Sequence, residues 1–184
     1  MIITLQECKT LLNITNSIKD NQISMLLPII EDEIREYCNN KFLDSSSQYS
    51  SNTIEFDKST NSIIDLYGNF TSSFYIGMQL DVFGSRTNDG IYQIKSLSDT
   101  NIQLESGYTV NNEDETIEIV LSKIDYPKLL KLIAAQMIDY QTNGKKDIEQ
   151  ETFSRYQVTY NTQSNTLAYP NSIIKSLNKF RKVY

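Results

Sequence analysis

Residues 20–40 have the sequence DNQISMLLPIIEDEIREYCNN, which carries a clear helical pattern. Its apolar residues recur at intervals of three and four, and this period places them on one side of an α-helix. The stripe consists of Ile23, Leu26, Leu27, Ile30, Ile34, Tyr37 and Cys38. Pro28 lies inside the pattern, and because proline lacks a backbone N–H, it should bend the helix unless the helix begins near Pro28. We therefore predict a helix over 20–40 that buries this stripe.

A shorter helix is predicted before residue 20. Thr4 and Glu7 have the spacing of a capping box, in which the two side chains satisfy backbone N–H groups at a helix start. Apolar residues then fall on one face of the predicted helix, namely Leu5, Cys8, Leu11 and Leu12.

Two more helices are predicted near the C-terminus, and each follows a Tyr-Pro pair. The first begins after Tyr126-Pro127 and ends at Asn143-Gly144, a typical C-cap. Its buried stripe is predicted to be Leu130, Ile133, Ala134, Met137 and Ile138. The second begins after Tyr169-Pro170, with Ile173, Ile174, Leu177 and Phe180 facing inward and Lys175, Lys179, Arg181 and Lys182 at its end. Between these helices, residues 153–160 alternate as a strand does.

The middle of the chain has a different pattern. After a Ser-rich stretch at residues 45–51, short runs alternate between apolar and polar residues, which is typical of an antiparallel sheet or barrel. These runs are 53–56, 62–66, 79–83, 90–94, 101–104 and 116–120. Asn88-Asp89-Gly90 lies between two of them and predicts a hairpin turn.

These patterns divide the chain into two predicted domains. Residues 1–43 and 123–184 form a small helical module, and residues 44–122 form an inserted antiparallel β-barrel-like domain, so the fold class is α+β. Charge follows the same division: residues 1–43 carry a net charge of −2, residues 44–122 carry −9, and residues 123–184 carry +5. Loop-closure entropy grows slowly with loop length, so an insertion costs the helical module little.

Composition argues against most catalytic chemistry. The chain has no His, which excludes Ser-His-Asp and Cys-His nucleophile pairs and every His-ligated metal site. Its two cysteines, Cys8 and Cys38, can form neither a disulfide framework nor a four-thiolate zinc site. They are expected to be buried thiols of a reduced, intracellular protein. We predict no catalytic, cofactor-binding or metal-ligating residue, no cofactor, and no enzymatic activity.

Two groups of carboxylates are candidates for metal or acid–base sites. For Glu31, Asp32, Glu33 and Glu36, a solvated helix face is the favoured interpretation. Asp81, Asp89 and Asp99 do not have the spacing of a calcium loop, so turn and strand-edge roles are favoured.

The sequence also predicts whether the protein is secreted or bound to a membrane. The first residues have no basic segment typical of a signal peptide, and no apolar run approaches the roughly 20 residues that span a bilayer. We expect a soluble protein that is neither secreted nor bound to a membrane.

Several stretches resemble known phage proteins. Residues 4–12, TLQECKTLL, and 26–39, LLPIIEDEIREYCN, resemble the opening of the head–tail connector (adaptor) proteins of tailed bacteriophages. Residues 148–160, IEQETFSRYQVTY, and 174–183, IKSLNKFRKV, are similar to the strand and closing helix of that family. Residues 74–94, FYIGMQLDVFGSRTNDGIYQI, look like a small β-barrel motif of phage virion proteins. Most connector proteins lack such an insertion.

The resemblance implies a non-enzymatic structural protein of the virion, assembled in the bacterial cytoplasm. It implies a ring, dodecameric like the portal, that binds beneath the portal protein and offers a platform to the next neck or tail component. Packaged DNA would pass through the ring without sequence-specific binding. The β-domain, with its charge of −9, is expected on the outer surface, away from the DNA.

Other functions remain open from the sequence. They are another neck, tail-completion or tail-terminator protein, a nucleic-acid-binding module suggested by the basic end, and an enzyme with a carboxylate or metal site. Within the connector hypothesis, the C-terminal helix is assigned to portal docking, and the alternative is a helix packed on its own domain with solvated lysines. The assigned residues are Ile174, Lys175, Leu177, Lys179, Phe180, Arg181 and Lys182.

Overall fold

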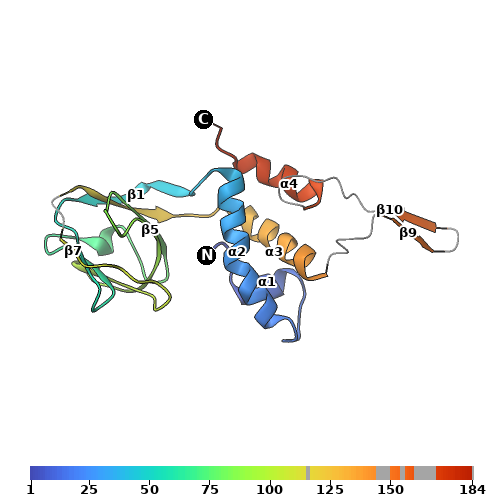
Figure 1. Ribbon diagram of the computed structural model, residues 1–184, viewed down its shortest axis with the longest axis horizontal. Coiled ribbons are helices and arrows are strands. Elements are labelled where there is room, and N and C mark those ends of the chain that lie inside the picture. The colour runs from blue at the N-terminus through green and yellow to red at the C-terminus, as the bar shows by residue number, and fades with distance from the viewer. Residues whose placement is uncertain (115–116, 144–149, 154–155, 160–168, 184) are drawn as a thin grey trace. The chain divides into compact units, whose positions relative to one another are not determined.

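The computed structural model describes residues 1–114, 117–143, 150–153, 156–159 and 169–183. It divides into two compact units, one of Met1–Lys41 with Tyr126–Tyr184 and one of Phe42–Asp125. We call them the helical unit and the β unit (Figure 1). The first is built mainly from four α-helices and the second from an antiparallel sheet, so the predicted α+β class is confirmed.

The helical unit contains α1 (Leu5–Leu11), α2 (Asp20–Cys38), α3 (Lys128–Asn143) and α4 (Asn171–Leu177), with a 3-10 turn η2 (Asn178–Phe180) after α4. A hairpin of β9 (Gln150–Phe153) and β10 (Tyr156–Thr159) lies between α3 and α4 in the sequence. A single strand was predicted over 153–160; β10 confirms it over Tyr156–Thr159, whereas Phe153 belongs to β9, an antiparallel partner strand that was not predicted. Residue 160 lies outside the described residues, and so do the side chains of the hairpin.

Helix α2 runs without interruption through Pro28, so the alternative of a start near Pro28 is wrong. Its first turn is formed, since the N–H of Ile23 donates to the carbonyl of Lys19 at 2.8 Å. The helix ends at Cys38, and its C-cap Asn39 has a φ of 46°, the left-handed conformation common at helix C-termini. In the first helix, α1, Thr4 and Glu7 form the predicted capping box.

The predicted core of the helical unit is confirmed. Five residues from α2 and α3 are at most 5% exposed, namely Leu27, Ile30, Ile34, Ile133 and Met137. The stripe of α1 was predicted less well, because Cys8 is buried whereas Leu11 is 44% exposed. Leu11 therefore belongs to the surface.

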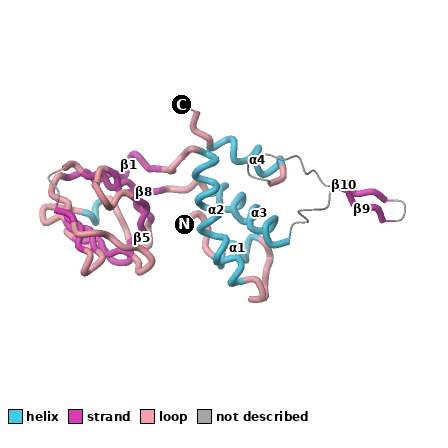
Figure 2. The backbone as a smooth tube through the Cα atoms, in the orientation of Figure 1, coloured by secondary structure: helices cyan, strands magenta, loops and turns pink. Residues whose placement is uncertain are grey.

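The β unit is one eight-stranded sheet that curls on itself (Figure 2). The strand order is β1-β8-β4-β5-β6-β3-β2-β7, and every pairing is antiparallel. The strands are β1 (Leu43–Ser51), β2 (Glu55–Asp57), β3 (Ser62–Ile64), β4 (Gln79–Phe83), β5 (Gly90–Leu97), β6 (Asn101–Leu104), β7 (Glu113–Asp114) and β8 (Ile119–Ile124), with a 3-10 turn η1 (Phe70–Ser72). The predicted hairpin is present, because β4 and β5 pair up to Val82 and Gly90.

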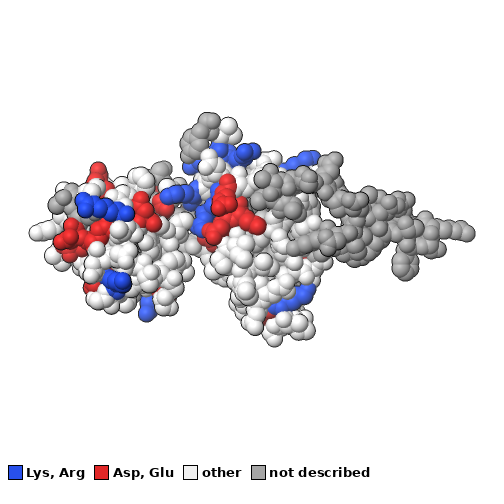
Figure 3. Space-filling view, in the orientation of Figure 1, with Lys and Arg blue, Asp and Glu red and all other residues white. Residues whose placement is uncertain are grey.

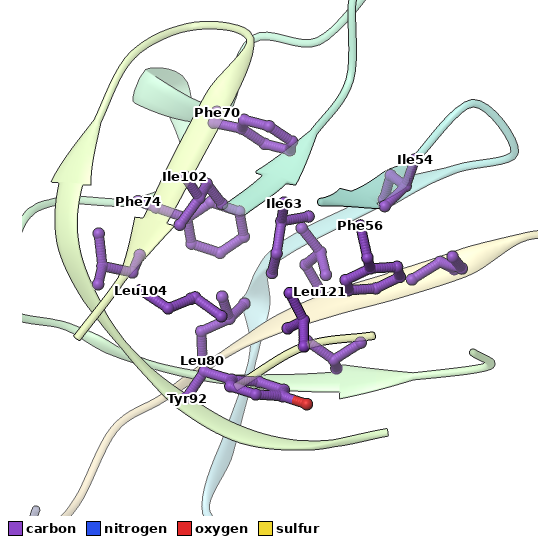
Figure 4. Close-up of a cluster of buried hydrophobic side chains, with 14 of the residues drawn as sticks. Ile54, Phe56, Ile63, Phe70, Phe74, Leu80, Tyr92, Ile102, Leu104 and Leu121 are labelled. Atoms are coloured by element: carbon purple, nitrogen blue, oxygen red, sulfur yellow. The ribbon is translucent and has the colours of Figure 1, made fainter. Parts of the chain in front are cut away.

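Curling encloses an apolar core between the strands. Figure 4 shows side chains from several strands directed toward one another, with Phe56 and Ile63 near Leu121, and Leu80 near Tyr92. Phe70 from η1 is fully buried in the same cluster. The β unit therefore has a hydrophobic core of its own, which is the physical requirement for a separate domain.

The Ser-rich stretch is the nine-residue strand β1, which was not predicted. Tyr49 fixes it to the core: its ring lies 4.9 Å from that of Phe70, and its hydroxyl donates to Asp65 at 2.7 Å. Burial alone would raise the pKa of Asp65, but hydrogen bonds from Ser51, Tyr49 and Thr53 hold that pKa below its usual range. Asp65 thus stays charged and holds the end of β1 in place.

The two ends of the β unit lie side by side. Leu43 of β1 pairs with Ile124 of β8, and the N–H of Asp125 donates to the carbonyl of Phe42 at 2.9 Å. Because β1 and β8, the first and last strands of the β unit, are neighbours, a short loop can connect the points at which the chain enters and leaves this unit. We propose on this basis that residues 44–122 are an inserted domain.

Replacing residues 44–122 by a short Gly-Ser loop should leave a folded helical unit, with its stability changed by no more than about 1 kcal/mol. Far-UV circular dichroism and thermal unfolding of the shortened chain measure this. The matched experiment uses residues 42–125 alone, which should fold as a β-protein. An unfolded or aggregated shortened chain would show that the β unit belongs to the helical core.

Candidate functional site

The C-terminal segment, which we define as residues 171–183, lies against the end of α2. Its helix α4 buries Ile173, Ile174 and Leu177 within the helical unit. The backbone beyond α4 is held by hydrogen bonds, because the N–H of Lys182 donates to the carbonyl of Cys38 at 2.9 Å. The segment is thus part of the folded unit as far as Lys182.

Side chains add further contacts at the same place. The hydroxyl of Tyr37 donates to Asn178 at 2.7 Å, and the amide of Asn40 donates to the carbonyl of Phe180 at 3.1 Å. The guanidinium of Arg181 lies 5.7 Å from the centre of the Tyr37 ring, a cation–π distance. These contacts hold the chain after α4, and the guanidinium of Arg181, against the end of α2.

The predicted docking residues fall into two groups. Four cations are exposed, namely Lys175, Lys179, Arg181 and Lys182. Figure 3 shows Lys and Arg side chains over α4 and near the end of the chain. Ile174 and Leu177 are 8% and 0% exposed, so their side chains pack inside the helical unit, and Phe180 is half-buried. The surface offered to a partner is therefore basic rather than apolar.

The acidic cluster of α2 was interpreted as a solvated face, and this is wrong for Glu31. Its carboxylate is 5% exposed and accepts hydrogen bonds from the N–H of Ile2 and the hydroxyl of Tyr126, both at 2.9 Å. It also pairs with Arg35 at 3.3 Å. Burial and the charge of Glu31 raise the pKa of Tyr126, so that hydroxyl remains a donor. Glu31 is therefore a buried structural anion.

The other members of the cluster differ in their surroundings. Glu33 accepts a hydrogen bond from the hydroxyl of Tyr169 at 2.8 Å, which ties α2 to the start of α4. Asp32 pairs with Arg35 and remains exposed, and Glu36 is exposed as well. Only Asp32 and Glu36 fit the interpretation of a solvated face.

The carboxylates of the β unit have structural partners. Asp81 was predicted at a turn or strand edge, which is wrong because it is buried in β4 between β5 and β8. Asp89 accepts from the N–H of Ser85 at 2.8 Å within the β4–β5 turn, and Asp99 accepts from Thr71. Both of these have the predicted turn roles.

Sequence reasoning missed Glu113, which organises the β4–β5 turn from another strand. Its carboxylate accepts from the N–H of Arg86 at 2.7 Å, from the hydroxyl of Thr87 at 2.8 Å and from the amide of Asn88. The turn lies more than 20 residues away in sequence, so no local pattern pointed to this contact.

Reactive groups are scarce among the described residues. There, no three His, Cys, Asp or Glu residues are placed to hold a metal ion. Burial raises the pKa of the Cys8 and Cys38 thiols to about 11, which keeps both protonated and unreactive at neutral pH. No described helix has the length and apolar character needed to cross a bilayer.

Comparison with known families gives a specific result for the N-terminal part of the chain. Residues 2–72 match the phage gp6-like head-tail connector protein family. The head-tail connector match spans α1, α2, the first three strands and η1, so the predicted resemblance is confirmed there. It ends before the predicted β-barrel motif at 74–94 and before the C-terminal segment. A search of curated proteins found no match.

Proposed function

We propose that the chain is a structural protein of the neck of a tailed phage, and that it links the DNA-filled head to the next neck or tail component. The observation that carries this proposal is the head-tail connector match over residues 2–72, which includes the helix α2 around which the helical unit is packed.

The finer parts of the proposal are a ring, portal binding and a place in the virion. We infer that copies of the chain form a ring beneath the portal, dodecameric in register with it, with packaged DNA passing through the lumen. The β unit is placed on the outside of that ring, since its net charge of −9 over residues 44–122 would repel DNA. Assembly takes place in the bacterial cytoplasm.

Docking on the portal is assigned to the exposed cations of the C-terminal segment. Lys175 and Lys179 are four residues apart on α4 and η2 and therefore project from one side. Such charges at an interface steer the encounter and fix the orientation of the partners. The portal surface that receives them should be acidic.

The double variant Lys175→Glu/Lys179→Glu should reduce tail attachment about tenfold while leaving the fold intact, because both side chains are exposed. Complementation of a phage lacking this protein, scored by infectious yield and by imaging of the particle neck, measures the effect. A truncation before Lys175 would be a poorer test, because it also removes the buried Leu177.

The control carries the same change of charge elsewhere. Lys58 and Lys95 are exposed on the β unit, and Lys58→Glu/Lys95→Glu should attach tails normally. Equal loss in both double variants would mean that net charge, not the C-terminal segment, controls attachment. Normal tail attachment by Lys175→Glu/Lys179→Glu would contradict the docking assignment. If the particle neck did not contain the protein at all, the proposed function itself would be wrong.

A further inference from the structure

The outer side of α2 is an exposed stripe with apolar and acidic halves. Met25 is 73% exposed and Ile29 is 52% exposed, and both follow the helical spacing that continues to Asp32 and Glu36. We call these four residues the α2 outer stripe. A partner that covers these two large apolar side chains removes their surface from water, which favours association.

A groove lies between α1 and α3 of the same unit. It has a volume of about 500 Å³, and its apolar wall is formed by Leu11 of α1 and Leu132 of α3. Both leucines are more than 40% exposed. Lys128 and Lys131 line the groove nearer the start of α3. We call this the α1–α3 groove.

These two surfaces point in different directions. Helices α2 and α3 pack on each other through their buried stripes, which contain Ile30 and Ile133. The opposite stripes of two such helices therefore face away from one another. One copy of the chain cannot bring its own outer stripe into its own groove, whereas two copies can meet in this way.

The charges of the two surfaces are complementary. Asp32 is paired with Arg35, and Lys131 with Glu7. Glu36 on the stripe and Lys128 in the groove have no ion pair within the part of the chain that the structure describes. A second copy can supply both missing partners while Met25 and Ile29 cover the leucines.

The order of apolar and charged residues along the stripe and along the groove fixes the direction of α2 relative to α3 of the neighbouring copy. Along α2 the apolar residues precede the acidic ones, and along α3 the basic residues precede Leu132. Apolar meets apolar and acid meets base only if α2 runs antiparallel to α3 of the neighbouring copy. Within one chain these helices are antiparallel too, since Arg35 contacts Tyr126 and Lys19 contacts Thr142. A small rotation from copy to copy preserves that relation, as in a ring with many members.

We propose that the α2 outer stripe of one copy packs into the α1–α3 groove of the next copy, and that this head-to-tail contact builds the ring. The contact joins two different surfaces, so each copy has one stripe and one groove to offer, and the series forms a ring when the rotation from copy to copy closes. This inference rests on the ring of the proposed function and names the surfaces that form it.

Crosslinking through introduced thiols tests the contact. In the full-length double variant Ile29→Cys/Leu132→Cys, a short bis-maleimide should join stripe to groove and give a ladder of covalent multimers on a denaturing gel. The native thiols are buried and protonated, so they stay silent. The single variants Ile29→Cys and Leu132→Cys are the controls, and neither should give more than monomer.

The experiment is done on concentrated protein and on particles complemented with each variant. A ladder from the double variant in either sample supports the contact, even if the neck proves not to contain the protein. Dimers from Ile29→Cys alone would overturn it, because stripe would then meet stripe. If the double variant gave no ladder in either sample, this result would also overturn the contact.

A charge exchange gives an independent readout. Glu36→Lys and Lys128→Glu should each weaken self-association about tenfold, and the two changes combined in one chain should restore it. Sedimentation of the purified variants measures the association. Singles that associate like the unchanged protein, or a double that stays as weak as the singles, would contradict the pairing.

Discussion

Replacing Ile133 by alanine is expected to lower the free energy of unfolding of the helical unit by about 2–5 kcal/mol. Ile133 is 1% exposed in α3, which packs against α2. Removing its outer carbons loses the transfer free energy of those atoms and leaves a cavity that close-packed neighbours fill only in part. Ile30→Ala in α2 should cost a similar amount. Urea unfolding followed by far-UV circular dichroism measures both losses.

The control lies one helical turn before Ile133. Leu129 is 41% exposed, so Leu129→Ala should change the stability by no more than about 0.5 kcal/mol. Losses below about 0.5 kcal/mol at both Ile30 and Ile133 would show that the buried stripes of α2 and α3 do not hold the unit together.

The helices could be predicted because their signals are local. The stripe of α2 repeats over five turns, and the Tyr-Pro start and Asn-Gly end of α3 lie within two residues of its observed bounds of Lys128 and Asn143. Pro28 shows the limit of such rules: eighteen other residues and the buried stripe favour the helix, and together they outweigh the loss of one hydrogen bond.

The β unit was predicted less completely. Strands β4 and β6 have the predicted bounds, since apolar and polar residues alternate through β6 and through β4 as far as Val82. Strand β1 was missed because serine has little preference for strands, and its position depends on pairing with β8 and on the contacts of Tyr49. Contacts between residues distant in sequence outweigh local preference here.

The candidate site shows a second limit of sequence reasoning. The apolar residues of α4 and its basic end were both recognised, but a sequence does not show whether an apolar stripe packs on its own unit or on a partner. The structure places Ile174 and Leu177 inside, so docking is left to the cations. Conversely, the groove proposed for the ring holds Leu11, which the sequence placed on the same helical face as the buried Cys8.

Removing the carboxylate of Glu31 is expected to destabilise the helical unit by about 3–5 kcal/mol, although Glu31 lies in a run of acidic residues that appears solvated in the sequence. In Glu31→Ala, Arg35 loses a buried anion, and the N–H of Ile2 and the hydroxyl of Tyr126 lose their acceptor. Each buried donor left without an acceptor costs about 1–3 kcal/mol, and Arg35, which keeps its pair with Asp32, loses the buried one of its two anions.

Two further variants separate the charge of Glu31 from its position. Glu31→Gln retains an oxygen that can accept from Ile2 or Tyr126 but has no charge for Arg35, so its loss should lie between that of Glu31→Ala and none. Glu36→Gln removes an exposed charge from the same helix and should change the stability by no more than about 0.5 kcal/mol. Urea unfolding of the three variants in dilute solution gives the comparison. If Glu31→Ala were no more damaging than Glu36→Gln, the carboxylate would be solvated in solution, and the network that joins α2 to Ile2 and Tyr126 would not contribute to the fold.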